Sequence, residues 1–473
     1  MINSYKFLIF FPFFFISCNK DINNEMPNII LIMTDDQGWG QTGYYDHPIL
    51  KTPNLDAMAK NGIRLDRFYA GAPQCSPTRA SVLTGRNNDR TGVFYHGYTL
   101  NRNEKTIAQV LKKAGYATGH FGKWHLNGLR GPGVPIFKDD RYSPGVFGFD
   151  RWLSVTNFFD IDPVMSYNGE FIEFEGSSSE IIVGEALKFI KEKKAMDLPF
   201  FTVIWDGSPH SPMLASEEDR SEFKDLDERS QHHYGELVAF DRSLGVLRKE
   251  LKELGISDNT ILWFCSDNGG LNGILPSTVG GLKGFKNTMW EGGLRVPAII
   301  EWPAVIKSSI SNYPTSTMDI FPTILDIVGI SESEILNPID GISIKPIFNS
   351  EKENRSVKIP FRFDDRGAMI DNNIKLVVRS IKDSQFELYN LGRDPKESND
   401  ISDENQEVFE VMKKDYLDWN MSVENSIKGN DYSNSEVSND SFPKVWNTDE
   451  RYKPYFTQWS KRPEYKNWIK IEK

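Results

Sequence analysis

The sequence of 473 residues predicts an α/β fold. We expect a large, mixed and mostly parallel sheet flanked by helices, followed by a smaller C-terminal α+β subdomain built on an antiparallel sheet. Two observations predict the large sheet: short apolar runs alternate with helical patterns, and several runs end in polar residues. A change to short strands and one helix after about residue 360 predicts the subdomain.

The first expected strand covers residues 28–33, with the sequence NIILIM. It is apolar throughout, which is typical of a parallel strand covered on both faces. It ends at Asp35 and Asp36. Ligands of open α/β sheets bind at the carboxyl ends of the strands, so both carboxylates are candidate site residues.

The strand is followed by an expected helix that begins at Pro53, with Thr52 as N-cap and Gly62 as the end. The same alternation continues along the chain. The later expected elements are helices over 105–114, 181–193 and 234–254, and strands over 116–122, 199–205 and 260–265. The last of these strands leads to Asp267 and Asn268, which adds two oxygen-bearing side chains at a second strand end.

The C-terminal part has a different pattern. We expect strands over 374–378 and 385–389 and a helix over 404–419 packed on them. A tail follows that wraps the body or borders the cleft, and its aromatic residues are Trp446, Tyr452, Tyr455, Trp459, Tyr465 and Trp468. We expect the main domain to cover residues 28–359, and the subdomain and tail to cover residues 360–473. Two short segments, residues 1–17 and 18–27, precede the main domain.

The first residues indicate export. Lys6 precedes an apolar run over 7–16 that is too short to span a bilayer, so residues 1–17 are predicted to be a signal peptide. The run ends in Ile-Ser-Cys, which resembles a bacterial lipobox with Cys18 as lipid acceptor, and residues 18–27 would form a tether. We expect a periplasmic or cell-surface lipoprotein of a Gram-negative, Bacteroidetes-like bacterium, held at the outer membrane through Cys18. The alternative is a plain signal peptide with an incidental Cys18.

Composition limits the partners. The net charge of −11 and the pI of about 5.3 argue against nucleic acid as a partner. An anionic substrate would have to meet local cations instead of a basic surface. The three cysteines are Cys18, Cys75 and Cys265; the last lies in an apolar strand and is predicted to be an inert core thiol, so no disulfide is proposed.

The most specific motif covers residues 75–85, with the sequence CSPTRASVLTG. C-x-P-x-R followed by Leu-Thr-Gly resembles the type I, formylglycine-dependent sulfatases of the alkaline-phosphatase-like superfamily. The resemblance extends over about residues 28–400. Its other matching blocks are TPNLD at 52–56, GKWHL at 122–126, SDNG at 266–269, EGGLRVP at 291–297, and ELYNL at 387–391 followed by Asp394-Pro395.

The resemblance implies that Cys75 is converted to formylglycine (3-oxoalanine) by a formylglycine-generating or maturase enzyme. It also implies one Ca²⁺ ion, bound by residue 75 together with Asp35, Asp36, Asp267 and Asn268. The residue types agree with this, since hard oxygen ligands suit Ca²⁺ or Mg²⁺ and not zinc. An isolated Asp pair would more simply cap a turn, but two oxygen-rich strand ends beside C-x-P-x-R favour the metal.

The resemblance also implies catalytic roles. Arg79 would hold the aldehyde hydrate, and Lys123 and Lys286 would bind the sulfate oxygens and the leaving group. His210 would protonate the leaving group, while His125 would take a proton from the second hydroxyl of the hydrate.

Some neighbouring residues have a weaker assignment. Lys286 is preferred over Lys283 because its distance from the EGG block matches the family, and Lys283 is kept as a supporting cation. His96, His232 and His233 match no family position. Residues 127–176 and the aromatic tail are expected to shape the pocket for the leaving group. Four cations are candidates for reading further anionic groups of the substrate: Arg102, Arg130, Lys138 and Arg141.

Three functions are compatible with these motifs. The first is a sulfatase acting on a sulfated polysaccharide or oligosaccharide, such as ulvan, carrageenan, fucoidan or a glycosaminoglycan. The second is a phosphonate monoester or phosphodiester hydrolase with the same formylglycine nucleophile. The third is a surface lipoprotein that binds sulfated glycans without turnover. Every polar position expected of the enzyme is filled, which favours the first.

Overall fold

The structure is a computed structural model that describes residues 26–433, 435, 437 and 442–469. The predicted signal peptide, Cys18 and most of the predicted tether lie outside these residues. Within the described ranges, no helix is both long and apolar enough to cross a membrane.

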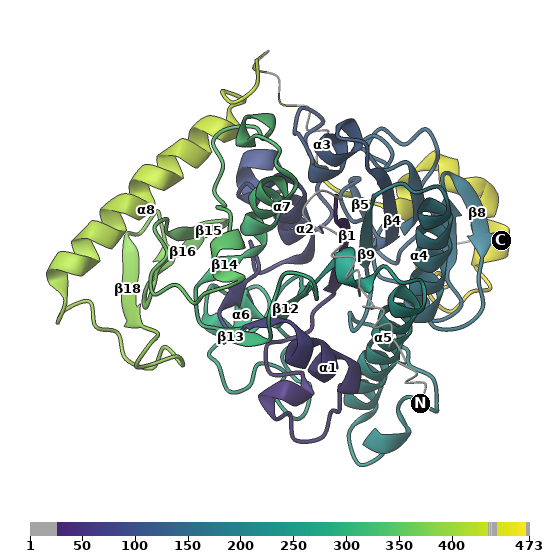
Figure 1. Cartoon of the computed structure of the whole chain (residues 1–473), viewed down its shortest axis with the longest axis horizontal. Helices are drawn as coiled ribbons and strands as arrows, with labels where there is room; N and C mark the ends of the chain where they lie inside the picture. Colours follow the sequence, from purple (N-terminus) through teal and green to yellow (C-terminus); the bar gives the residue numbers. More distant parts are fainter. Residues whose placement is uncertain (1–25, 434, 436, 438–441, 470–473) are drawn as a thin grey trace, which may run out of the picture.

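A ten-stranded sheet forms the centre of the molecule (Figure 1). In spatial order its strands are β13 (Ser309–Ser311), β2 (Ile63–Leu65), β12 (Ala298–Glu301), β10 (Thr260–Ser266), β1 (Asn28–Thr34), β9 (Phe200–Trp205), β4 (Ala117–Lys123), β6 (Arg151–Val155), β7 (Val164–Tyr167) and β8 (Glu170–Glu173). The strands from β10 to β6 are parallel, whereas β12, β7 and β8 pair antiparallel with their neighbours. The predicted mixed sheet with a parallel centre is confirmed.

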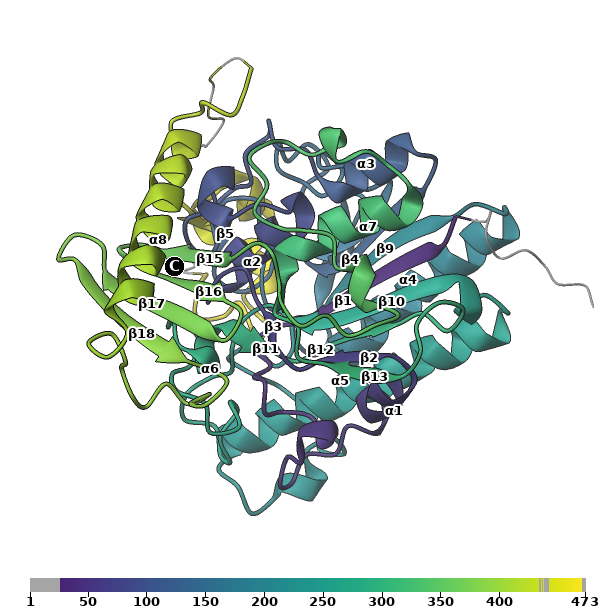
Figure 2. The same ribbon diagram turned by 60° about the vertical axis from the view of Figure 1, so that its left-hand side comes forward.

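Both faces of this sheet are covered by helices (Figure 2). Ile30 and Ile32 of β1 belong to one apolar cluster, together with residues of α1 (Pro53–Asn61), α4 (Ser178–Ala195) and α5 (Glu228–Glu253). The alternate residues of β1 belong to a second cluster with α2 (Cys75–Thr84), α3 (Ile107–Lys113) and α7 (Ile320–Val328). Because successive side chains of a strand point to opposite faces, a continuously apolar strand needs both layers.

The helix boundaries depend on local contacts that periodicity does not reveal. Gly62 follows the last residue of α1. Only glycine fits at this position, because a Cβ would lie 2.3 Å from the carbonyl oxygen of Ile300. Thr52 precedes α1, but its hydroxyl accepts a hydrogen bond from the backbone N–H of Gly43 instead of capping the helix. Helix α5 begins at Glu228, earlier than predicted, because the side chain of Asp227 caps it.

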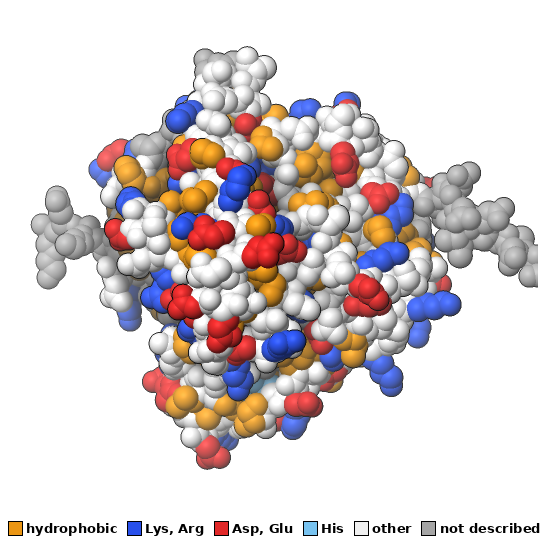
Figure 3. Space-filling model, turned by 90° about the vertical axis from the view of Figure 1, so that its left-hand side faces the viewer, with side chains coloured by type: hydrophobic (Ala, Val, Ile, Leu, Met, Phe, Trp, Pro, Cys, Tyr) orange, Lys and Arg blue, Asp and Glu red, His pale blue; other side chains and the backbone are white. Residues whose placement is uncertain are grey.

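The predicted C-terminal antiparallel sheet is present. It consists of β15 (Ile359–Phe363), β16 (Arg366–Asp371), β17 (Ile374–Ser380) and β18 (Gln385–Asn390), with the long helix α8 (Gln406–Ile427) packed beside it (Figures 1 and 2). On this side of the molecule acidic and basic side chains are interspersed and do not gather by sign (Figure 3). This face therefore presents no extended surface of one charge.

A third, smaller sheet lies between these parts: β11 (Arg295–Val296), β3 (Phe68–Tyr69) and β14 (Thr315–Ser316), with α6 (Glu291–Leu294) before β11. The tail continues with β19 (Lys444–Val445), which pairs with β5 (Leu129–Arg130), and with α9 (Phe456–Trp459). Short 3₁₀ helices cover Gly43–Tyr45, Asn88–Thr91, Ser221–Phe223, Ser257–Asn259, Thr317–Asp319, Glu332–Glu334, Lys345–Ile347, Trp446–Thr448 and Glu450–Tyr455.

The tail packs on the main body through its aromatic residues. The buried ones form one cluster with Leu129, Val134 and Val164: Trp446, Tyr452, Trp459 and Tyr465. Two tail hydroxyls also donate hydrogen bonds to the loop after β5, Tyr465 to the carbonyl of Gly133 (2.6 Å) and Tyr452 to that of Pro135 (2.8 Å). The predicted association of the tail with the body is therefore visible in its described part.

Candidate functional site

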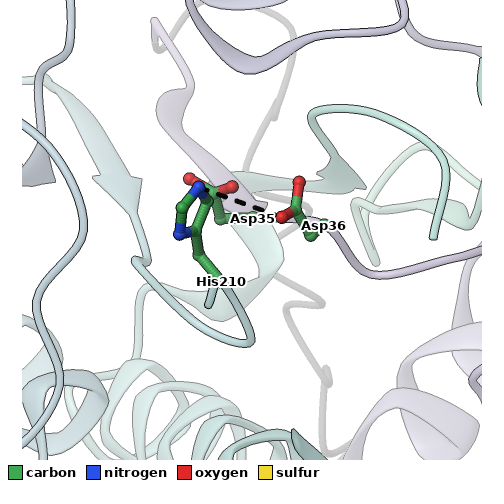
Figure 4. Close-up of side chains that lie close together, drawn as sticks. All are labelled: Asp35, Asp36 and His210. Atoms are coloured by element: carbon green, nitrogen blue, oxygen red, sulfur yellow. Dashed lines mark ion pairs between the residues drawn. The ribbon is translucent and has the colours of Figure 1, made fainter. Parts of the chain in front are cut away.

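The two oxygen-rich strand ends lie side by side. Parallel pairing of β1 with β10 places Thr34 opposite Ser266, so that Asp35 and Asp36 emerge next to Asp267 and Asn268. The backbone N–H of Asp36 donates to the carboxylate of Asp267 (3.1 Å). All four side chains are buried. Figure 4 shows Asp35 and Asp36 adjacent at the end of β1.

Helix α2 brings the motif cysteine to these carboxylates. Cys75 is the first residue of α2, and Arg79 follows one turn later on the same side of the helix. The guanidinium of Arg79 bonds the carboxylates of Asp35 (2.9 Å) and Asp267 (2.8 Å). The thiol of Cys75 and one carboxylate oxygen each of Asp35 and Asp267 lie within 4.8 Å of one another. The nucleophile position and the strand ends thus form one cluster.

Two lysines neutralise part of the negative charge of these carboxylates. Lys123, the last residue of β4, forms an ion pair with Asp35, and Lys286 forms one with Asp36. Lys283 is directed elsewhere, since its ammonium donates to the carbonyl of Glu397 (3.0 Å) and lies 3.5 Å from the ring centroid of Trp290. Of the two lysines compared from the sequence, only Lys286 reaches the cluster.

His125 follows β4 with a left-handed backbone (φ 55°) and a buried ring. Neither ring nitrogen has a hydrogen-bond partner among the described residues. Burial, together with the positive charges of Lys123 and Arg79, lowers the pKa of His125 well below its ordinary value. His125 is therefore a neutral imidazole in this arrangement, and its one unprotonated ring nitrogen can accept a proton.

His210 lies in the loop after β9 and faces the carboxylates (Figure 4). Its Nδ1 donates to the carbonyl of Ser211 (2.5 Å), its Nε2 lies 4.0 Å from Asp36, and its ring stacks on Phe158 with centroids 4.9 Å apart. Burial and the charges of Lys123 and Lys286 lower the pKa of His210 to about 4. The Nε2 atom is thus the one directed at the cluster.

The carboxylates differ in electrostatic environment. Burial alone would raise the pKa of Asp35, but the charge of Lys123 and then those of His210 and Arg79 outweigh it and lower the pKa. For Asp267, burial and the neighbouring negative charge of Asp35 raise the pKa to about 7 in spite of Arg79. Asp267 is therefore short of positive charge. Burial also raises the pKa of the Cys75 thiol.

The donor set fits a hard divalent cation. Asp35 Oδ1 and Asn268 Oδ1 are buried and have no hydrogen-bond partner in the described part of the chain. Such atoms are costly unless a ligand or ion satisfies them. The amide nitrogen of Asn268 donates to Asp36 (2.7 Å), which places the amide group at the carboxylates. Carboxylate and amide oxygens are typical ligands of Ca²⁺.

A cavity of about 500 Å³ opens over Cys75. The predicted residues that line it are Cys75, His125, His210 and Lys286, and also Arg130, the one member of the four candidate cations found in the lining. Four more lining residues fall in the two segments expected to shape the pocket: Gly131, Asn157 and Phe158 within residues 127–176, and Trp468 in the aromatic tail. The sequence gave no role to the rest: Gln74, Tyr95, His96, Asn287, Pro443 and Val445. They come from separate loops and the tail, and no spacing in the sequence links them.

Comparison with known proteins agrees with the motifs. The sequence model of the Sulfatase family matches residues 27–330, and that of the N-sulphoglucosamine sulphohydrolase C-terminal region matches residues 283–421. N-acetylgalactosamine-6-sulfatase of Canis lupus familiaris is 34% identical over 360 residues, which are 68% of this chain and 66% of that protein. The chain thus spans slightly less than two thirds of this relative.

A bacterial relative, the ulvan-active sulfatase of Formosa agariphila, is 30% identical over 374 residues, covering 73% of this chain and 68% of that protein. Among solved structures, Ps i-CgsB in complex with a neocarrahexaose superimposes with a TM-score of 0.75 at 23% identity over 94% of this chain and all of that chain. The phosphonate monoester hydrolase of Agrobacterium radiobacter is less similar, with a TM-score of 0.57 at 19% identity over 85% of this chain and 96% of that chain. The structural likenesses establish the fold.

The family match covers the strand ends, the motif helix and both lysines that reach the cluster, so the residues assembled here are those of the matched region. The sequence identity to the curated relatives extends over more than two thirds of the chain. The chain belongs to the sulfatase family.

Proposed function

We propose that the protein is a sulfatase that hydrolyses sulfate esters of a sulfated polysaccharide or oligosaccharide. The observation that carries this proposal is the convergence of Cys75 with Arg79 and the carboxylates of Asp35 and Asp267 at the floor of one cavity. In the proposed enzyme Cys75 is converted to formylglycine by a dedicated modifying enzyme. Asp35, Asp36, Asp267, Asn268 and the modified residue 75 hold one Ca²⁺ ion.

The two groups supply complementary chemistry. Hydrated formylglycine at position 75 would supply one hydroxyl as the nucleophile toward sulfur and a second whose deprotonation would release sulfate, and Ca²⁺ held by these residues would supply a Lewis acid for the sulfuryl oxygens. Arg79 is fixed by its two carboxylate bonds and orients the side chain at position 75. Lys123 and Lys286 neutralise charge that develops on the sulfate oxygens and the bridging oxygen.

The histidines divide the proton transfers. His125 accepts a proton on its one unprotonated ring nitrogen, since the ring is neutral and neither nitrogen has a partner among the described residues. His210 donates a proton to the leaving oxygen from Nε2, because Nδ1 is already engaged with Ser211. A sulfate ester bound beside His210 adds negative charge, which raises the pKa of His210 and favours its protonated form.

The glycan substrate is supported by the relatives. One acts on ulvan by its name, another on N-acetylgalactosamine 6-sulfate, and a structural neighbour was solved with a bound carrageenan oligosaccharide. The predicted signal peptide places the protein outside the cytoplasm, where such polymers are met, and lipid on Cys18 would hold it at the outer membrane.

A first prediction tests the nucleophile. We expect mass spectrometry of the peptide that contains residue 75 to give the formylglycine mass. Cys75→Ala should reduce sulfate release to background and leave the melting temperature within about 2 °C of wild type, because this small side chain contributes little packing. Unmodified Cys75 in native, active protein would contradict the mechanism, as would near wild-type activity of the variant.

Paired aryl esters separate the two hydrolase alternatives. Sulfate release from an aryl sulfate should exceed phosphate release from the matching phosphodiester or phosphonate monoester by at least about 100-fold in kcat/KM, or roughly 2.7 kcal/mol. The opposite preference would assign the protein to phosphorus chemistry. Formylglycine without any ester hydrolysis would favour a glycan-binding protein.

A further inference from the structure

The cavity over Cys75 does not end at the catalytic residues. A second cavity of about 640 Å³ adjoins it, and Tyr95, Arg130 and Pro443 line both. The two spaces therefore meet at Arg130. Together they exceed what one sulfated sugar requires, since pockets of about 300–1,000 Å³ accommodate whole drug-sized ligands.

Arg130 is held at this junction by the tail. It belongs to β5, whose partner is β19, with Arg130 opposite Val445. The aliphatic stem packs beside Gly97, where a Cβ would lie 2.8 Å from Arg130 Cγ. The guanidinium contacts the ring nitrogen of His96. Three carboxylates also line the second cavity, but Asp89 and Glu424 form ion pairs with Arg362, and Asp364 forms none with Arg130. Among the described residues Arg130 has no carboxylate partner, so its positive charge is available to an anion.

An aromatic side chain borders the same space. Trp468 is 38% exposed and lines the cavity over Cys75. Its ring lies over Gly131, where a Cβ would be 3.4 Å from Trp468 Cζ3. The carbonyl of Trp468 accepts a hydrogen bond from the side chain of Asn447 (2.5 Å), and the buried Tyr465 anchors the preceding turn to Gly133. An exposed, fixed indole beside an arginine is suited to a sugar face next to an anionic group.

The part of the chain that forms this wall is outside the family matches. The two matched regions end at residue 421, whereas Pro443, Val445 and Trp468 lie beyond it. The proposed catalytic residues thus come from the matched region, and one wall of the cavity comes from the segment that follows it.

We propose that Arg130 and Trp468 form a specificity subsite that binds an anionic substituent, a carboxylate or a second sulfate, on the glycan next to the scissile sulfate ester. This inference rests on the proposed sulfatase function. Arg130 supplies the charge and bidentate geometry for the anion, and Trp468 packs on the sugar. Small aryl sulfates reach the catalytic cluster without using this subsite.

The test compares a small and a large substrate. We expect Arg130→Ala and Trp468→Ala to lower kcat/KM on sulfated oligosaccharides by about 10- to 100-fold, mainly through KM, as expected for lost charge-assisted and aromatic contacts. Turnover of an aryl sulfate should stay within about twofold of wild type. Arg393→Ala, which removes an exposed arginine outside the cavity lining, is the matched control and should change neither.

Two oligosaccharides distinguish the sources of the anion. Ulvan fragments carry uronate carboxylates beside sulfate, whereas carrageenan fragments carry sulfate alone. A loss in Arg130→Ala confined to ulvan fragments assigns the subsite to a carboxylate, and a loss confined to carrageenan fragments assigns it to a second sulfate. Equal losses on glycan and aryl sulfate, or no loss on either glycan, would overturn the proposal.

Binding separates this inference from the proposed function. In a Cys75→Ala background, calorimetry with the same fragments should give affinity that Arg130→Ala weakens at least tenfold and that Arg393→Ala leaves unchanged. If wild type binds these fragments through Arg130 but releases no sulfate, the proposed function fails and the subsite stands. If sulfate is released and Arg130→Ala behaves as wild type, the subsite fails and the function stands.

Discussion

The carboxylates of the proposed catalytic site do not each have a cation of their own. Arg79 is shared between Asp35 and Asp267, while Lys123 pairs with Asp35 and Lys286 with Asp36. Burial and the negative charge of Asp35 raise the pKa of Asp267, and the charge of Arg79, which Asp267 shares with Asp35, does not offset them. The residues at this site therefore depend on one another, and the effect of each substitution will reflect the charge that it leaves uncompensated.

The two neighbouring lysines give a paired prediction at the scale of a residue. Lys286→Ala should lower kcat on an aryl sulfate by about 10²–10³-fold, the usual effect of removing one charge-stabilising donor. Lys283→Ala should stay within about threefold of wild type, because the Lys283 ammonium bonds Glu397 and not the cluster. Steady-state kinetics of both variants measures the difference. A comparable loss in Lys283→Ala would show that the site extends further than the lining of the cavity.

Asp160 gives a prediction on pH. Burial, and then the charges of Asp206 and Glu464, raise the pKa of Asp160 from 3.8 to about 8. The folded state thus retains a proton that the unfolded chain loses above about pH 4. Stability from this group is complete below pH 4, declines between about pH 4 and 8, and stays low above that range. Asp160→Asn removes the ionisation, so its melting temperature should fall less than that of wild type from pH 5 to pH 8.

Calorimetry across this pH range provides the measurement, and Asp197→Asn is the control because Asp197 is exposed. The control should follow the wild-type curve. If the melting temperature of Asp160→Asn follows the wild-type curve, Asp160 is ionised in the folded protein. Another group must then compensate the negative charge of the buried carboxylates nearby.

At the scale of elements, a buried charge triad joins the small C-terminal sheet to the main body. Lys375 of β17 lies between Glu291 of α6 (3.0 Å) and Glu397 (2.8 Å), and all three side chains are fully buried. Glu397 also accepts a hydrogen bond from the backbone N–H of Glu291 (2.7 Å). The triad therefore fixes β17, α6 and the loop after β18 relative to one another, close to the loop that carries Lys286.

Lys375→Met should destabilise the protein by about 3–5 kcal/mol, since it leaves the carboxylate of Glu397 buried without its cation and that of Glu291 with Arg295 alone, at 3.7 Å. Urea unfolding followed by fluorescence measures this loss. Arg379→Ala on the same strand is the control, because Arg379 is exposed and its pair with Glu387 is long (3.5 Å); we expect a change below about 0.5 kcal/mol. Equal stability of wild type and Lys375→Met would mean that the triad contributes nothing to the attachment of the sheet.

The sequence predicted the elements whose pattern is determined by burial on two sides. The run at 28–33 is apolar throughout because helices cover both faces of β1, and β9 and β10 were predicted for the same reason. The short strands β6 to β8 and β15 to β16 were not predicted, since they are four to six residues long and carry mixed side chains. Their pairing depends on neighbours distant in the sequence.

The same distinction applies to the site. The convergence of the proposed site residues was predictable because they follow strands or open a helix within recognisable motifs, as Asp35 and Cys75 do. Phe158 and Trp468 lie in the two segments that were expected to shape the pocket, whereas His96 and Asn287 were not predicted as members of the cavity wall, because their position depends on tertiary packing. Of the scattered cations, Arg130 reaches the cavity only because β19 pairs with β5.

At the scale of the whole molecule, the proposed metal site lies where the centre of the fold is assembled. Asp35 and Asp36 follow β1, Asp267 and Asn268 follow β10, and residue 75 begins α2, which belongs to the apolar cluster on one face of the sheet. An ion bound by all of them stabilises only the state in which β1, β10 and α2 are in place. Binding to the folded protein alone raises its stability through mass action.

Removal of calcium should therefore lower the melting temperature of the whole protein. At Ca²⁺ concentrations about 100 times Kd the stabilisation is about 2.7 kcal/mol, which corresponds to a rise of a few °C in a protein of this size. We expect EGTA to lower the melting temperature, Ca²⁺ to restore it, and equimolar Mg²⁺ to restore it incompletely, because Mg²⁺ demands a stricter octahedral arrangement.

In Asp36→Asn, which weakens the donor set without altering its volume, the rise in melting temperature on adding Ca²⁺ should shrink to less than half of the wild-type rise. A wild-type melting temperature that changes with neither EGTA nor Ca²⁺ would contradict the metal site. It would mean that Arg79, Lys123 and Lys286 compensate the carboxylates on their own. Water would then satisfy the two buried oxygens without a hydrogen-bond partner, Asp35 Oδ1 and Asn268 Oδ1.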